Sequence, residues 1–119
     1  NELFVVDDKT GTPTLTYDFA KNLKLLIENK QWGLFNMVCS GFVSRLDVAS
    51  ELLSALNLKD KIKLTKVNSE YWSKDYFAPR PDCECLINKK LNNLNMNIMR
   101  DWKTCLNEYV KNYYSDLIN

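Results

Sequence analysis

The chain contains no histidine, and glycine occurs only 3 times in its 119 residues. Histidine is the commonest general base near neutral pH, and glycine-rich loops are the usual cradle for nucleotide phosphates. No Gly-x-Gly-x-x-Gly motif follows a predicted strand, and no serine or cysteine has a base nearby in the sequence. We therefore predict that the chain carries no catalytic residue of its own and binds no nicotinamide cofactor.

An excess of charge of one sign is also missing, since 16 Lys and Arg residues are matched by 15 Asp and Glu residues. A net charge of +1 gives no field strong enough to steer nucleic acid or to hold an acidic membrane surface. No apolar run approaches the roughly 20 residues of a membrane helix, and no signal peptide opens the chain. We expect a cytoplasmic protein with neither nucleic acid nor membrane as a partner.

The cysteines are few and unevenly spaced, at Cys39, Cys83, Cys85 and Cys105. A Cys-x-Cys pair matches no zinc or redox motif, and a chain without histidine excludes a mixed Cys/His metal site. Disulfides are rare in a reducing cytoplasm. We therefore predict buried or idle thiols and no bound metal.

A single α/β domain over residues 1–119 is predicted, because 45% of the residues are apolar and the chain shows no repeat or linker. Runs of β-prone residues at 3–6 and 34–38, and an alternating run at 62–67, predict strands. A helical turn is predicted at 69–72 and an irregular stretch at 73–85. Together with the helices described next, this gives a small mixed sheet of short strands covered by helices.

Caps and apolar stripes define four predicted helices. Thr16 is interpreted as the cap of the first, Ser44 with Asp47 as a capping box for the second, and Asn88 as the cap of the third. The third helix runs to Leu94, Asn95 ends it in a left-handed conformation, and the last begins near Met99. The stripes predicted to face the core are Phe19, Ala20, Leu23, Leu26 and Ile27, then Leu46, Ala49, Leu52, Leu53 and Leu56, and finally Trp102, Cys105, Leu106, Tyr109, Val110 and Tyr113.

A turn rich in hydroxyl groups is the first candidate binding site. The adjacent carboxylates Asp7 and Asp8 would point to opposite faces of a strand, so we interpret them as a solvated turn and not as a catalytic dyad. Gly11, Thr12 and Thr14 then surround a proline just before a helix, where hydroxyls and free amides suit a sugar or an anion. The alternative is that a threonine here merely caps the helix.

Arg80 is the second candidate, because a proline stands on each side of it. A residue before proline is held in extended geometry, so the guanidinium is presented on a stiff backbone. A preset guanidinium fork suits bidentate recognition of a phosphate. The alternative is an ordinary solvated arginine on the surface.

These segments resemble those of the dTDP-4-dehydrorhamnose reductases. Residues 5–14 resemble the family's V-V-D-D-Q-x-G-x-P-T, and residues 33–49 resemble its G-h-[YF]-[HN]-h-V and G-x-x-S-[RW] positions. Residues 80–91 are similar to R-P-x-x-S-x-L-x-N-x-K-L, and residues 99–109 are similar to M-R-D-W-x-x-A-L-x-E-Y. The chain has Lys9 where the family usually has Gln, Cys85 where it has Ser, Asn95 where it has Gly and Cys105 where it has Ala. Cys83 is a further departure.

The resemblance implies the C-terminal, nucleotide-sugar-binding lobe of an extended short-chain reductase. The whole enzyme would use NADPH, or NADH, held by an N-terminal Rossmann domain, to reduce the C4 ketone of dTDP-4-dehydro-L-rhamnose to dTDP-L-rhamnose for cell-surface polysaccharide synthesis. Its glycine-rich loop and Tyr-x-x-x-Lys pair lie upstream of the segments matched here. The substrate-binding residues implied are Arg80, Gly11, Thr12 and Thr14, with a dTDP-sugar as ligand.

Two other functions fit the same segments. One is the corresponding lobe of a related nucleotide-sugar epimerase or dehydratase, although the Met-Arg-Asp-Trp segment at 99–102 favours the reductases. The other is a non-catalytic regulatory or interaction module with a reductase-like fold, because a fold can be reused without its chemistry.

Overall fold

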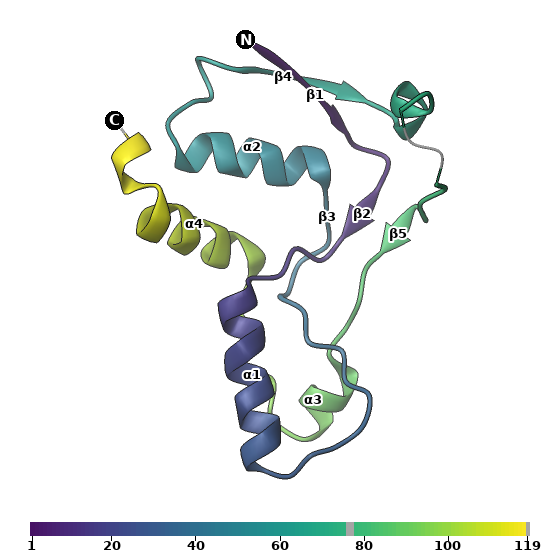
Figure 1. Ribbon diagram of the computed structural model, residues 1–119, viewed down its shortest axis with the longest axis vertical. Helices are drawn as coiled ribbons and strands as arrows, with labels where there is room; N and C mark the ends of the chain where they lie inside the picture. The colour runs from purple at the N-terminus through teal and green to yellow at the C-terminus, as the bar shows by residue number, and fades with distance from the viewer. Residues whose placement is uncertain (76–77, 119) are drawn as a thin grey trace.

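The computed structural model describes residues 1–75 and 78–118, and it is a mixed α/β fold with short strands, as predicted (Figure 1). The structure places α2 against the paired strands β1 and β4 and α4 against α2, whereas α1 and α3 lie at the other end of the molecule. The elements in chain order are β1 (Glu2–Val6), β2 (Thr10–Gly11), α1 (Thr16–Glu28), β3 (Val43–Ser44), α2 (Arg45–Ala55), β4 (Lys63–Val67), the 3-10 turn η1 (Ser69–Trp72), β5 (Cys83–Glu84), α3 (Lys89–Asn93), α4 (Trp102–Tyr113) and the 3-10 turn η2 (Ser115–Leu117).

Two small sheets carry the strands. β1 pairs in parallel with β4, in a register that runs from Glu2 opposite Lys63 to Val6 opposite Val67. The second sheet has the order β3-β2-β5, with β2 antiparallel to β3 and parallel to β5. The strands predicted at 3–6 and 62–67 and the helical turn at 69–72 are confirmed. The stretch predicted to be irregular contains one short strand, because residues 83–84 continue the sheet beside β2.

Two of the predicted helix starts are wrong, and the two marked by Ser44 and Asn88 are confirmed. Ser44 and Asp47 form the predicted capping box, with each side chain accepting a hydrogen bond from the other's backbone N–H. Thr16 is the first helical residue of α1 and caps nothing, because the cap position falls on Leu15. α4 begins at Trp102 and not near Met99, because the Asp101 carboxylate accepts hydrogen bonds from the first-turn amides and fixes the start there.

The core lies where α4 meets the segment leading into β3. Cys39, Trp102 and Cys105 are buried there and are surrounded by half-buried apolar side chains. Trp102 is 4% exposed, which confirms it as a core residue. The predicted core face of α4 is wrong at Tyr109 and Tyr113, since these side chains are 38% and 72% exposed and their rings pack against each other.

The apolar stripe predicted for α1 does not face this core. Phe19, Leu23 and Ile27 are between 40% and 51% exposed. The helix instead buries polar side chains, Asp18 and Asn22, together with Leu26. These side chains are buried because Asp18 forms an ion pair with an arginine and the Asn22 side-chain oxygen accepts a hydrogen bond from the backbone of Ile98. We call the exposed side chains Phe19, Leu23 and Ile27 the outer face of α1.

The strand predicted at 34–38 is wrong within the described residues, because this segment joins no sheet. Its Leu34 side chain is 82% exposed. Asn88 substitutes for a partner strand, accepting a hydrogen bond from Val38 N at 2.9 Å and donating one to Val38 O at 2.7 Å. Asn88 occupies the cap position of α3, as predicted, but its side chain makes no capping bond because Val38 engages it. Asn95 takes the predicted left-handed conformation, with a φ of 52°.

Candidate functional site

The turn after β2 is the first candidate surface. The Thr14 hydroxyl donates a hydrogen bond to Thr12 O at 3.0 Å and accepts one from Cys39 N at 3.2 Å. It is therefore engaged within the fold and holds the turn against the core. The Thr12 hydroxyl makes no hydrogen bond with any described residue. A methyl group at Gly11 would meet no atom within 4 Å, so this glycine keeps the surface beside the turn open.

An open hollow of about 320 Å³ lies between this turn and α4. Thr14 and Pro13 form one side, and Trp102, Leu106 and Tyr109 form another, with Cys105 at the wall. Hydroxyl groups beside aromatic and apolar walls suit a sugar or a base ring, because one face of such a ring is apolar and its edge is polar.

Arg80 lies on a separate part of the surface. Its backbone oxygen accepts a hydrogen bond from Lys9 Nζ at 3.0 Å, and Lys9 also pairs with the Asp82 carboxylate at 2.5 Å. The Arg80 side chain is exposed, and its guanidinium has no hydrogen-bond or ion-pair partner among residues 1–75 and 78–118. The backbone is thus fixed, and the charged group is left available.

The two sequence-predicted surfaces are not part of one pocket. Because β2 and β5 run parallel, Arg80 lies alongside Lys9 before β2, whereas Thr12 and Thr14 follow the end of that strand. At the rise of a β-strand, the separation of about five residues corresponds to roughly 15 Å. Only an elongated ligand, such as a nucleotide sugar, would reach both surfaces.

Asp7 and Asp8 border a second open hollow, of about 430 Å³, together with Lys66 and Asn68. Hydrogen bonds from Lys66, and to a smaller extent from Ser44, lower the pKa of Asp7. The Asp8 pKa is also lowered, chiefly because its carboxylate accepts the Ser69 backbone N–H. Both carboxylates are therefore ionised at neutral pH and engaged in holding neighbouring segments.

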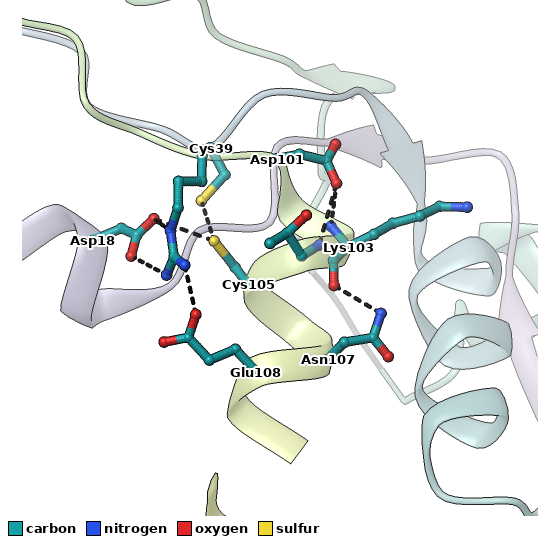
Figure 2. A network of polar contacts seen from close by, with 9 residues as sticks. Asp18, Cys39, Asp101, Lys103, Cys105, Asn107 and Glu108 are labelled. Carbon is teal, nitrogen blue, oxygen red and sulfur yellow. Dashed lines mark hydrogen bonds and ion pairs between the residues drawn. The ribbon is translucent and has the colours of Figure 1, made fainter. Parts of the chain in front are cut away.

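A buried polar cluster stands behind the first hollow (Figure 2). Arg100 donates hydrogen bonds to both oxygens of Asp18 and a third to Glu108. The bonds from Arg100 are the main reason that the pKa of Asp18 is lowered. This cluster was not predicted from the sequence, because Asp18 and Arg100 are 82 positions apart and no local pattern indicates that they meet. An aspartate in the first turn of an amphipathic helix was the one available signal.

The thiols of Cys39 and Cys105 lie 3.6 Å apart in the same cluster, and both are buried, as predicted for idle cysteines. Burial, followed by the hydrogen bonds with Asp18 and Cys39, raises the pKa of Cys105 to about 12. This thiol is therefore protonated at neutral pH and is a poor nucleophile. Cys83 differs, because it is exposed and the backbone N–H of Cys85 lowers its pKa.

The fold, with short strands in small sheets covered by helices, defines the class of protein: it is that of the C-terminal part of reductases of the dTDP-4-dehydrorhamnose type. Within that class, the family model described as "RmlD substrate binding domain" matches residues 1–115. The chain belongs to this family.

Solved structures similar to this chain support the assignment. A dTDP-4-dehydrorhamnose reductase from Clostridium acetobutylicum is 34% identical and superimposes with a TM-score of 0.89 over 95% of this chain and 39% of its own. A dTDP-4-dehydrorhamnose reductase from Bacillus anthracis, solved in complex with NADP, is 24% identical with a TM-score of 0.82, covering 95% of this chain and 38% of its own. At that identity the second likeness shows the fold alone.

A curated relative is the spore coat polysaccharide biosynthesis protein SpsK of Bacillus subtilis. It is 29% identical over 110 residues, which cover 92% of this chain and 37% of the relative. The chain thus spans less than two fifths of the length of these similar proteins. Among the described residues, no helix has the length and apolar character needed to cross a membrane.

Proposed function

We propose that residues 1–119 form the lobe that binds the nucleotide sugar in an NADPH-dependent dTDP-4-dehydrorhamnose reductase. The observation that supports this best is the 34% identity to the Clostridium acetobutylicum reductase, with a TM-score of 0.89. The whole protein would reduce the C4 ketone of dTDP-4-dehydro-L-rhamnose by hydride transfer. The name of the Bacillus subtilis relative, a spore coat polysaccharide biosynthesis protein, agrees with a role in cell-surface polysaccharide synthesis.

The ligand of this lobe is a dTDP-sugar. Its diphosphate lies against the unpaired guanidinium of Arg80, because a charge-assisted bidentate contact is the strongest that this surface offers. The sugar lies near the turn after β2, where the Thr12 hydroxyl has no partner among the described residues and Gly11 leaves room. Thr14 contributes indirectly, because its hydroxyl accepts a hydrogen bond from Cys39 N and so holds the turn in place.

The cofactor, NADPH or alternatively NADH, is held by an N-terminal Rossmann domain of the same protein. The outer face of α1 supports such a partner, because its three apolar side chains and the nearby Leu34 have no covering element among the described residues. Apolar side chains gathered in this way mark an interaction surface more often than a solvated one.

Turnover measurements test whether this lobe binds the nucleotide sugar while another domain binds the cofactor. The chain alone, mixed with dTDP-4-dehydro-L-rhamnose and NADPH, should leave the absorbance of the reduced nicotinamide unchanged. The same residues joined to a cofactor-binding lobe should consume NADPH, and replacing Leu23 with Asp on the outer face should lower that activity. The exposed and polar Lys24 provides a matched control, because Lys24→Asp adds the same side chain on the same helix. Turnover by the chain alone would contradict the proposal.

A further inference from the structure

Three potential metal ligands meet in the core although they come from separate elements. Asp18 lies in α1, Cys39 precedes β3 and Cys105 lies in α4. Their exposed fractions are 2%, 1% and 2%, and one oxygen and two sulfur atoms lie within 4.8 Å of one another. Figure 2 shows the two sulfur atoms and the carboxylate directed toward one another.

Two of the three distances among these atoms are close to those between ligands on a tetrahedral metal ion. Metal–sulfur bonds of about 2.3 Å and metal–oxygen bonds of about 2.1 Å give a sulfur–sulfur edge of about 3.8 Å and a sulfur–oxygen edge of about 3.6 Å. The structure has 3.6 Å between the Cys39 and Cys105 sulfur atoms. It has 3.3 Å between the Cys105 sulfur and Asp18 Oδ2. An ion would enter with small outward shifts of the side chains.

Charge balance also favours an ion at this place. Arg100 offsets the negative charge of Asp18. When a divalent ion binds, each thiol releases one proton to solvent, so the net charge of the cluster does not change. Burial therefore does not oppose binding as it would oppose an isolated charge. Arg100 also fixes the orientation of the Asp18 carboxylate, the role that outer-shell partners play in metal sites.

Access from solvent is provided by the hollow described above. Of the three ligands, Cys105 lines this hollow beside Thr14 and Trp102, so the hollow is the side from which an ion would enter. Three protein ligands and one water complete a tetrahedral coordination shell. Because Cys39 N also donates a hydrogen bond to Thr14, an ion held by Cys39 would be connected directly to the turn after β2.

We propose that Asp18, Cys39 and Cys105 form a binding site for one thiophilic divalent metal ion of the Zn²⁺ class. The bound ion cross-links α1, α4 and the segment before β3. It acts as a structural element beneath the turn after β2. The site depends only on residues of this chain, so it stands or fails independently of the proposed reductase activity.

Cadmium titration tests the site, using the 119-residue chain with Cys83→Ala and Cys85→Ala so that the other thiols do not contribute. We expect thiolate-to-cadmium absorption in the ultraviolet that saturates at one equivalent, together with a higher thermal midpoint. Adding Cys105→Ala should remove the absorption and weaken Cd²⁺ binding more than about 100-fold, beyond the loss usual for an outer-shell partner.

Co²⁺ provides a second readout, because intense visible absorption reports tetrahedral coordination. Cys39→Ser and Cys105→Ser keep the size of each side chain and serve if an alanine variant unfolds, and circular dichroism checks the fold. The proposal is overturned if the Cys83→Ala/Cys85→Ala chain binds no Cd²⁺. It is also overturned if Asp18→Ala or Cys105→Ala in this background leaves the affinity for Cd²⁺ unchanged.

Discussion

Arg100 and Asp18 are 82 positions apart in the chain, yet they form a two-bonded ion pair, Nε to Oδ2 at 2.8 Å and Nη2 to Oδ1 at 2.7 Å. The Asp18 side chain is 2% exposed and that of Arg100 is 39% exposed. The pair therefore holds the first turn of α1 to the segment that leads into α4. Removing either partner would leave an unpaired charge at the edge of the core.

The first prediction concerns acid stability. The pKa of Asp18 is lowered, so its pairing stabilises the fold above the unfolded pKa of about 3.9, and this stability is lost as the pH falls through the folded pKa. Asp18→Asn should cost roughly 3 kcal/mol at pH 7, the low end for a buried pair, because Arg100 is 39% exposed. Urea unfolding between pH 7 and pH 3 measures both effects.

In the Asp18→Asn variant the loss of stability below about pH 4 should be smaller than in the parent chain. Asp60→Asn is the matched control, since Asp60 is exposed, and it should leave the acid response nearly unchanged. Identical pH profiles for the parent chain and Asp18→Asn would show that the pair contributes nothing to acid stability.

The second prediction compares two glycines that share a positive φ, Gly33 at 123° and Gly41 at 100°. A methyl group at Gly33 meets open space, so Gly33→Ala carries backbone strain alone, about 1–2 kcal/mol. At Gly41 the methyl would fall on Trp102 Cδ1 and lie 2.8 Å from Nε1. Gly41→Ala should therefore cost about 1–3 kcal/mol more than Gly33→Ala in urea unfolding. Equal losses would show that Trp102 moves aside freely.

The third prediction concerns the end of α1. Lys30 has a φ of 52°, and the backbone bonds Lys30 N to Ile27 O and Gln31 N to Leu26 O form a Schellman motif around it. A left-handed conformation costs a residue with a Cβ about 1–2 kcal/mol, and glycine avoids this cost. Lys30→Gly should raise the free energy of unfolding by up to about 1 kcal/mol, since glycine also gains freedom in the unfolded chain.

Asn57 ends α2 with the same geometry, at a φ of 56°. Asparagine tolerates the left-handed region better than lysine does, so Asn57→Gly should stabilise less than Lys30→Gly. Thermal or urea unfolding of the two variants makes the comparison. Destabilisation by Lys30→Gly would mean that the lysine side chain contributes to the fold through contacts beyond its backbone.

The fourth prediction concerns ligand binding in the intact protein. Arg80→Ala should weaken binding of a dTDP-sugar by about 1.5–3 kcal/mol, the worth of a hydrogen bond to a charged group. Arg80→Lys should recover part of this, because an ammonium group cannot form two parallel bonds. NADPH affinity should stay the same, because another lobe holds the cofactor. Calorimetry measures the affinity of each variant for the dTDP-sugar and for NADPH. Unchanged dTDP-sugar binding in Arg80→Ala would make Thr12 the leading candidate.

Local patterns in the sequence correctly predicted the elements whose formation depends on neighbouring residues. The alternation at 62–67 predicted β4, and the Ser44–Asp47 capping box is present with both of its hydrogen bonds. Periodicity failed for α1, because it identifies an apolar face without showing what covers that face. Long-range polar pairing decided the orientation of the helix, since Asp18 binds Arg100 and the Asn22 side-chain oxygen accepts a hydrogen bond from Ile98 N, both more than 70 positions away.

In the candidate site, too, local features could be predicted from the sequence and long-range contacts could not. Exposure of Arg80 follows from its two flanking prolines, which stiffen the backbone locally. The meeting of Cys39 and Cys105 depends on tertiary contacts, above all the bridge between Ser40 and Asp101 that brings the two segments together. Spacing along the chain does not predict such a contact, because 66 positions separate the two thiols.

The parallel pairing of β1 with β4 has a consequence for folding kinetics. Glu2 accepts a hydrogen bond from Thr65, 63 positions further along the chain, so the strands meet only when a long loop closes. Closing such a loop costs entropy before any contact repays it, whereas α1 and α2 form from local contacts. The β1–β4 pair should therefore assemble late. Substitutions within it should speed unfolding and leave the refolding rate almost unchanged.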